Sequence, residues 1–220
     1  MKMKKTWLLL LAIVALWNYS SAQNGRYIQG EGAVVTKTLK LDNFDEIGLA
    51  VVGEVHLSKG STQKVTVKGQ ANIINNLKTE VEDGEWAIEF DQKARNYEKL
   101  IFEITVPDIE GLSIAGSGSI IGKDAFNGLD RLDIAIAGSG DVKFAGSARK
   151  VSVSIAGSGN VQVENLKTED CKVDIAGNGD CSIEVTEALS VSIAGSGDVK
   201  YKGSPRLNTS IAGSGKVRRM

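Results

Sequence analysis

A short glycine-rich phrase that occurs six times in the second half of the chain constrains the fold more than any other feature. The alanine of its Ala-Gly-Ser/Asn-Gly core lies at positions 115, 137, 156, 176, 194 and 212, so successive copies are 18 to 22 residues apart. An internal period of about 20 residues is typical of solenoids, in which each repeat forms one layer of a stack. The repeat therefore predicts a stacked architecture for residues 112–220.

Apolar and polar residues alternate on both sides of this core. Relative to the alanine, positions −5, −3, −1, +5 and +7 are mostly apolar, whereas −4, −2, +4 and +6 are mostly Ser, Asp, Asn, Lys or Arg. Alternation with a period of two is the pattern of a β-strand, and two glycines around a small polar residue suit a turn that needs positive φ. Each copy therefore predicts a strand, a tight turn and a second strand.

Stacking equivalent strands at about 4.8 Å lets every copy hydrogen-bond to the next and bury its apolar side. We predict an all-β fold, a single-stranded parallel β-helix (β-solenoid) with about six regular rungs of 18–22 residues. Identical positions form columns in such a stack, including an interior isoleucine ladder. Its members are Ile114, Ile136, Ile155, Ile175, Ile193 and Ile211.

The first half of the chain has strand-like runs without the regular phrase. They lie at 35–41, 54–58, 64–69, 85–90 and 100–107, with Asp83-Gly84 as a turn and residues 72–77 as a single helical turn. We interpret residues 34–111 as irregular, wider first rungs that cap the regular solenoid of residues 112–220. A separate small β domain is the alternative.

The N-terminus has the three-part pattern of a secretory signal peptide over residues 1–22, followed by a short arm at 23–33. Three lysines precede an apolar run, and small residues precede a cleavage site between Ala22 and Gln23. The apolar run is shorter than the roughly 18–20 residues that a membrane-spanning helix needs, although an uncleaved anchor is the alternative. We therefore expect an exported protein with no membrane span in the mature chain.

Composition argues against several classes of partner. Removing the leader leaves 23 basic against 27 acidic side chains, which makes nucleic acid an unfavourable partner. One histidine and two cysteines leave little material for a metal site. We expect no cofactor and no metal ion, and the oligomeric state stays open.

Two outward-facing sets are weak candidates for binding. At position +4, the column Asp141, Asn160, Asp180 and Asp198 could hold Ca²⁺ or a cationic group, but its spacing differs from the known nine-residue calcium repeat, which favours a solvated column of turn residues. The second set is a hydroxyl-rich face that could accept a glycan or a partner sheet, with a plain solvated face as the alternative. It includes Ser154, Ser192 and Ser210.

Cys171 and Cys181 both occupy inward positions of one rung. Export permits a disulfide between them, and two buried thiols are the alternative. His56 falls on an outward position with no second histidine in the mature chain, so we expect it to be exposed and without a metal or catalytic role. We predict no catalytic residue.

The tandem SIAGSGSI and IAGSGDV phrases, preceded by FDEIGLAVVGEVHLSKGSTQKVTVKG, TEVEDGEWAIEF and ITVP, resemble the head GIN domain family of proposed auto-transporter adhesins. The resemblance covers roughly residues 33–217. It implies an envelope or secreted β-solenoid of a Gram-negative, Bacteroidetes-type bacterium, located in the periplasm, at the cell surface or outside the cell, and it supplies no catalytic residues.

Two functions follow from these patterns. The favoured one is a non-enzymatic, adhesin-like module of the cell envelope that contacts a surface glycan or an envelope protein. The alternative is a β-helix carbohydrate-active enzyme, a lyase or a glycosidase. A glycosidase would need two carboxylates at a defined separation in a groove.

Overall fold

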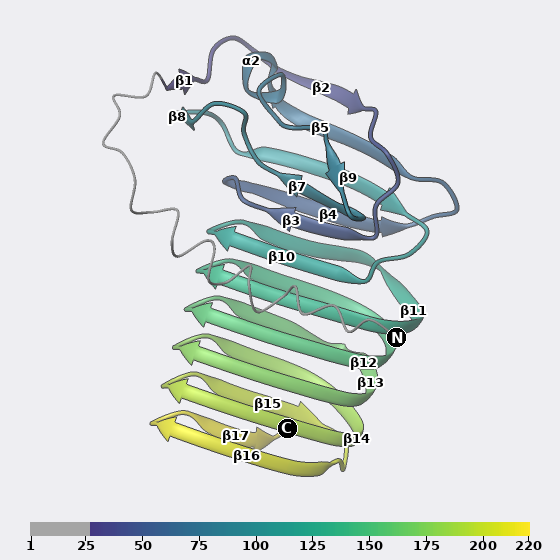
Figure 1. The fold of residues 1–220 in the computed structure, drawn as a ribbon, viewed down its shortest axis with the longest axis vertical. Coiled ribbons are helices and arrows are strands. Elements are labelled where there is room, and N and C mark those ends of the chain that lie inside the picture. Colours follow the sequence, from purple (N-terminus) through teal and green to yellow (C-terminus); the bar gives the residue numbers. More distant parts are fainter. Residues whose placement is uncertain (1–26) are drawn as a thin grey trace.

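The computed structural model describes residues 27–220, and the signal-peptide cleavage site expected at Ala22 and Gln23 lies outside them. The chain forms a β-solenoid of about 5 turns, which confirms the predicted fold class (Figure 1). Six copies of the phrase give about five coils of the solenoid, because each coil runs from one copy to the next. No helix within residues 27–220 has the length and apolarity needed to cross a bilayer.

Four strands of the regular half each span a whole coil of the solenoid. Each long strand starts after one Ala-Gly-Ser/Asn-Gly turn, passes through a bend at the opposite end, and finishes at the next turn. The strands that build the regular half are β10 (Gly111–Gly116), β11 (Ser119–Gly138), β12 (Asp141–Gly157), β13 (Asn160–Gly177), β14 (Asp180–Gly195), β15 (Asp198–Lys202), β16 (Arg206–Gly213) and β17 (Lys216–Arg219). We call the sheet of segments that lead into these turns the first sheet, and the sheet of segments that follow them the second sheet.

Parallel pairing keeps equivalent residues of successive rungs opposite one another. Ile155, for example, is paired with Ile136 on one side and Ile175 on the other. The isoleucines from Ile114 to Ile193 are only 1–3% exposed, which confirms the interior ladder. The ladder ends at Ile211, which is 42% exposed because no described strand covers the outer edge of β16.

The two glycines of each turn serve different purposes. The first has positive φ, between 118° and 142° in the six copies, as the sequence predicts. The second does not have positive φ, so this part of the expectation is wrong. It is required for close approach instead, because a Cβ on Gly159 would lie 2.4 Å from the carbonyl oxygen of Gly140 in the preceding turn.

The N-terminal half continues both sheets but stacks out of sequence order. The strands β3 (Glu46–Leu49) and β4 (Gly53–Lys59) form a rung that pairs in parallel with β10 and β11. The rung of β7 (Glu85–Ile88) and β9 (Leu100–Val106) follows in sequence, yet it packs on the far side of β3 and β4. The two halves therefore share both sheets, and the later rung is the outer one.

Smaller elements complete this end, shown at the top of Figure 1. Two antiparallel strands extend the second sheet, a short helix follows them, and a tight Asp83-Gly84 turn joins a two-residue strand to β7. These elements are β2 (Val34–Leu39), β5 (Lys64–Gln70), α2 (Ala71–Ile74) and β6 (Val81–Glu82), with β1 (Ile28–Gln29) paired to β8 (Ala94–Arg95). The elements β2, β5 and α2 agree with the predicted strands and helical turn to within a few residues, whereas β1, β6 and β8 were not predicted.

Candidate functional site

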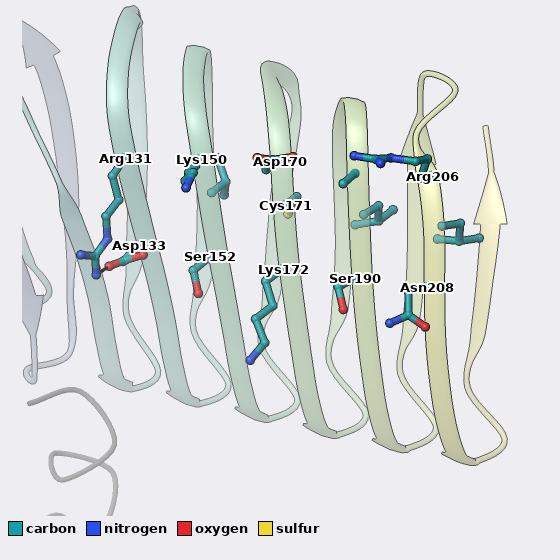
Figure 2. Close-up of a pocket in the computed structure, with 14 residues that line it drawn as sticks. Arg131, Asp133, Lys150, Ser152, Asp170, Cys171, Lys172, Ser190, Arg206 and Asn208 are labelled. Carbon is teal, nitrogen blue, oxygen red and sulfur yellow. Dashed lines mark ion pairs between the residues drawn. The ribbon is translucent and has the colours of Figure 1, made fainter. Parts of the chain in front are cut away.

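A groove of about 750 Å³ follows the solenoid axis across the outer face of the first sheet (Figure 2). We call it the axial groove. It lies where successive rungs leave the bend and enter the first sheet. Its lining comes from five rungs, as Arg131 and Asp133, 150–152, 170–172, 188–190 and 206–208.

The register gives the axial groove two walls and a floor. In each rung two outward side chains flank one that points to the interior, because neighbouring residues of a strand face opposite sides. The bend-side wall comprises Arg131, Lys150, Asp170, Ala188 and Arg206, and the turn-side wall comprises Asp133, Ser152, Lys172, Ser190 and Asn208. The floor between them is formed by Val151, Cys171, Leu189 and Leu207.

Some charges in the groove are already compensated. Asp133 is only 6% exposed and forms an ion pair with Arg131. On the turn-side wall, Lys172 Nζ lies 2.5 Å from Oδ2 of Asp174, a residue outside the groove lining. Among the described residues, Lys150 and Arg206 have no ion-pair partner, and both are exposed.

The predicted hydroxyl face lies beside the turn-side wall. Ser154, Ser192 and Ser210 share one column, which Asp174 interrupts between Ser154 and Ser192. The three serines therefore lie in one column, with a gap at Asp174. The sequence analysis missed the groove itself, although basic residues at position −6 of three copies were a signal for it.

The acidic column lies on the other sheet and is occupied by contacts between rungs. The side-chain amide of Asn160 donates to Asp141 Oδ1 at 2.8 Å, and Asp180 Oδ1 accepts the backbone N–H of Asp198 at 2.8 Å. Asp198 accepts the N–H of the next rung, and the Arg218 guanidinium bound to it lowers the pKa of its carboxyl. In residues 27–220 no group of three or more His, Cys, Asp or Glu side chains is arranged to hold a metal ion.

The two cysteines are free thiols inside the same rung. Burial raises the pKa of Cys181 to about 12 and also raises the pKa of Cys171. Since the thiolate is the reactive form, both groups are poor nucleophiles in the folded protein.

His56 points outward as predicted, but its side chain is only 16% exposed, so the expectation of a solvated histidine is wrong. Its ring nitrogens contact Glu54 at 2.5 Å and Glu103 at 2.7 Å. Glu103 is the register partner of His56 in β9, 47 residues away in sequence. Lys99 and His56 lower the pKa of Glu54 to about 2, mainly through the hydrogen bond from Lys99.

The outer face of the first sheet changes charge along the solenoid axis. At the capped end Glu85 and Glu46 are register partners, and burial raises the pKa of both. A second hollow there is lined by Glu80, Glu82, Glu85, Glu89 and Asp91, with one lysine. The axial groove, towards the open end, contains more basic than acidic side chains. The outer face of the first sheet is therefore acidic at the capped end and more basic at the axial groove.

A family model described as "Putative auto-transporter adhesin, head GIN domain" matches residues 43–205. The chain belongs to the head GIN domain family. No curated protein matches it.

Solved structures similar to this head GIN domain protein include proteins of Bacteroides and Parabacteroides species. A protein of Bacteroides fragilis described as a putative adhesin is 26% identical over 88% of this chain and 100% of its own, with a TM-score of 0.72. A putative adhesin of Parabacteroides merdae is 20% identical over 88% of this chain and 99% of its own, with a TM-score of 0.57. A putative lipid binding protein of Parabacteroides distasonis is 22% identical over 89% of this chain and 100% of its own, with a TM-score of 0.59. The last two likenesses show the shared fold alone.

Proposed function

We propose that this head GIN domain protein is an exported, adhesin-like module that binds an extended partner in the axial groove without chemical turnover. The observation that carries the proposal is the repetition of the groove lining over five rungs. Family membership and the likeness to the Bacteroides fragilis protein described as a putative adhesin support the adhesin-like role.

The repetition favours an elongated ligand. Rungs are spaced at about 4.8 Å, so five rungs present equivalent positions over roughly 19 Å. A polymer that follows the solenoid axis meets one bend-side and one turn-side wall residue at every rung. Several weak contacts then add along one chain, which suits adhesion through a repeating surface polymer.

The carboxylates of the groove are poorly placed for hydrolysis of a glycan. Glycosidases use two carboxyl groups on either side of the scissile bond. Asp133 is nearly buried and tied to Arg131, and Asp170 lies two rungs further along, on the opposite wall. This arrangement supports binding over catalysis.

The signal-peptide pattern supports export to the periplasm, the cell surface or the exterior. Protease shaving of intact cells tests the surface location. Loss of the protein from intact cells places it outside the outer membrane, whereas protection until the outer membrane is opened places it in the periplasm.

The function is tested with the protein purified from cells that express the full chain. Envelope polysaccharides of the source bacterium and of neighbouring species are immobilised, and binding is measured for the wild type and for Ser190→Trp, which fills the middle of the groove. The matched control is Ser182→Trp on the outer face of the second sheet. We expect loss of binding for Ser190→Trp alone. Equal binding by all three proteins, or release of sugar fragments, contradicts the proposal.

A further inference from the structure

We infer that the ligand of the axial groove is a linear acidic polysaccharide, and that Lys150 and Arg206 bind its anionic groups. This inference rests on the proposed function and names the ligand class of the same site. It follows from the charges of the groove, from their spacing, and from the chemistry of the walls and floor.

The groove reverses the charge balance of the chain. Over the whole sequence acidic residues outnumber basic ones by 27 to 26, whereas the groove lining holds four basic and two acidic side chains. The pairs Arg131–Asp133 and Lys172–Asp174 are internally neutral. Within the described part of the chain, Lys150 and Arg206 are the groove cations without an ion-pair partner. They are therefore the groups available to an anion.

The spacing of the two cations requires a polymer. Lys150 and Arg206 are three rungs apart in the register that runs through Asp170 and Ala188, which corresponds to about 14 Å along the axis. One carboxylate or phosphate cannot contact both side chains. A chain whose charged groups recur along its length reaches both while it lies in the groove.

The walls and floor favour sugar over other polyanions. Ser152, Ser190 and Asn208 present hydroxyl and amide groups that both donate and accept hydrogen bonds, as sugar hydroxyls do. Leu207, which is 45% exposed, adds an apolar contact for the C–H face of a pyranose ring at the open end, whereas Val151, Cys171 and Leu189 are buried. An extended pyranose chain advances by about one rung spacing per sugar, so each sugar meets the two wall positions of one rung.

Peptides and nucleic acids fit this surface less well. The strands β12, β13 and β14 are paired on both sides, and β16 is the one groove strand with an open edge among the described residues. A peptide that added to β16 as a strand would lie across the solenoid axis and would not follow the groove. Binding of single-stranded nucleic acid relies on aromatic side chains that stack on bases, and the groove lining contains none.

The test measures binding of the full exported protein to soluble polymers by calorimetry at low ionic strength. Polygalacturonate, alginate and dextran sulfate are the acidic probes, pullulan is the neutral probe, and polyglutamate is the acidic peptide probe. We expect the acidic polysaccharides alone to bind. Binding weakens as salt is added, because exposed charges are screened beyond about 10 Å at 0.1 M salt.

Variants test whether the two cations are responsible. Lys150→Ala combined with Arg206→Ala is expected to lower the affinity about tenfold, since two exposed ion pairs are worth about 1.4 kcal/mol together. Lys150→Arg with Arg206→Lys retains binding. Asp170→Asn, which removes a negative charge between them, raises the affinity. The control is Lys143→Ala, which removes an exposed lysine of the second sheet and leaves the affinity unchanged.

The outcomes separate this inference from the proposed function. Equal binding of pullulan, equal binding of polyglutamate, or an unchanged affinity of the double alanine variant overturns the inference. Failure of every acidic polysaccharide to bind overturns it as well. If Ser190→Trp still blocks binding to envelope polysaccharide in any of these cases, the proposed function stands and only the ligand class is wrong.

Discussion

The backbone N–H of Ser158 donates a hydrogen bond to the carbonyl oxygen of Gly138, one rung earlier, at 2.8 Å. Equivalent bonds join Ser139 to Gly116, Asn178 to Gly157 and Ser196 to Gly177. The hydrogen-bond ladder of the two sheets thus continues through the turns. It leaves no room for a side chain at the first glycine of any turn that stacks on a preceding one, from Gly138 to Gly213.

Substitution of that glycine tests this arrangement. Gly157 has φ of 131°, and a Cβ there would lie 2.2 Å from the Gly138 carbonyl oxygen. Gly157→Val and Gly195→Val should therefore both lower the melting temperature markedly, since backbone strain of about 1–3 kcal/mol is combined with a backbone clash.

Gly116→Val is the matched control, because Gly116 also has positive φ but a Cβ there meets no atom within 4 Å. It should show the smaller loss, from strain alone, in the same thermal melts. An unchanged melting temperature for Gly157→Val and Gly195→Val would contradict the assigned role of the turn.

The isoleucine ladder predicts that replacing isoleucine by alanine lowers the free energy of unfolding by different amounts in different rungs. Ile155→Ala removes a side chain that is 1% exposed and should cost about 2–5 kcal/mol of unfolding free energy. Ile211→Ala, at the same position of the uncovered last rung, should cost about 1 kcal/mol or less, because Ile211 is 42% exposed. Urea unfolding of both variants measures the difference. Equal losses would mean that another chain covers the last rung in solution.

The periodic features were predictable from sequence, whereas features that depend on cross-strand neighbours were not. The ladder from Ile114 to Ile193 follows from alternation and a repeated core, which place equivalent residues in register. The columns of the axial groove lie at fixed offsets of −6 to −4 from the alanine, but the alternation does not show which outward columns border a groove, because that depends on the bend beside them.

The order in which the rungs stack could not be predicted from the sequence pattern either. Alternation shows which residues of 85–106 face the core, but it does not show which rung they pack against. The same limit hid the partner of His56, since Glu103 becomes its neighbour only when β9 packs beside β4.

Glu54 predicts a loss of stability in acid. The hydrogen bonds from Lys99 and His56 hold its pKa at about 2, below the ordinary glutamate value of 4.5. A carboxyl with a depressed folded pKa stabilises the fold above its unfolded pKa, and that stabilisation is lost as pH falls from about 4.5 to about 2.

Glu54→Gln should therefore unfold more easily than the wild type at pH 6 and show a smaller dependence on pH below 4.5. Chemical unfolding between pH 2 and pH 7 measures both effects. Glu187→Gln, at an exposed bend position, is the control. Parallel pH profiles for the wild type and Glu54→Gln would show that this network does not contribute to acid stability.

The cysteine pair predicts a thiol count that depends on folding. Cys171 and Cys181 are 5% and 1% exposed, and burial raises the pKa of both. A thiol reagent at pH 8 should therefore label neither cysteine in the native exported protein and both after denaturation without reductant.

Two thiols released on denaturation match the free pair in the structure. No labelling until reductant is added would show that the exported protein carries a disulfide between these residues, as its oxidising compartment allows. Mass spectrometry of the alkylated protein distinguishes the two states directly, because each alkylated cysteine adds a fixed mass.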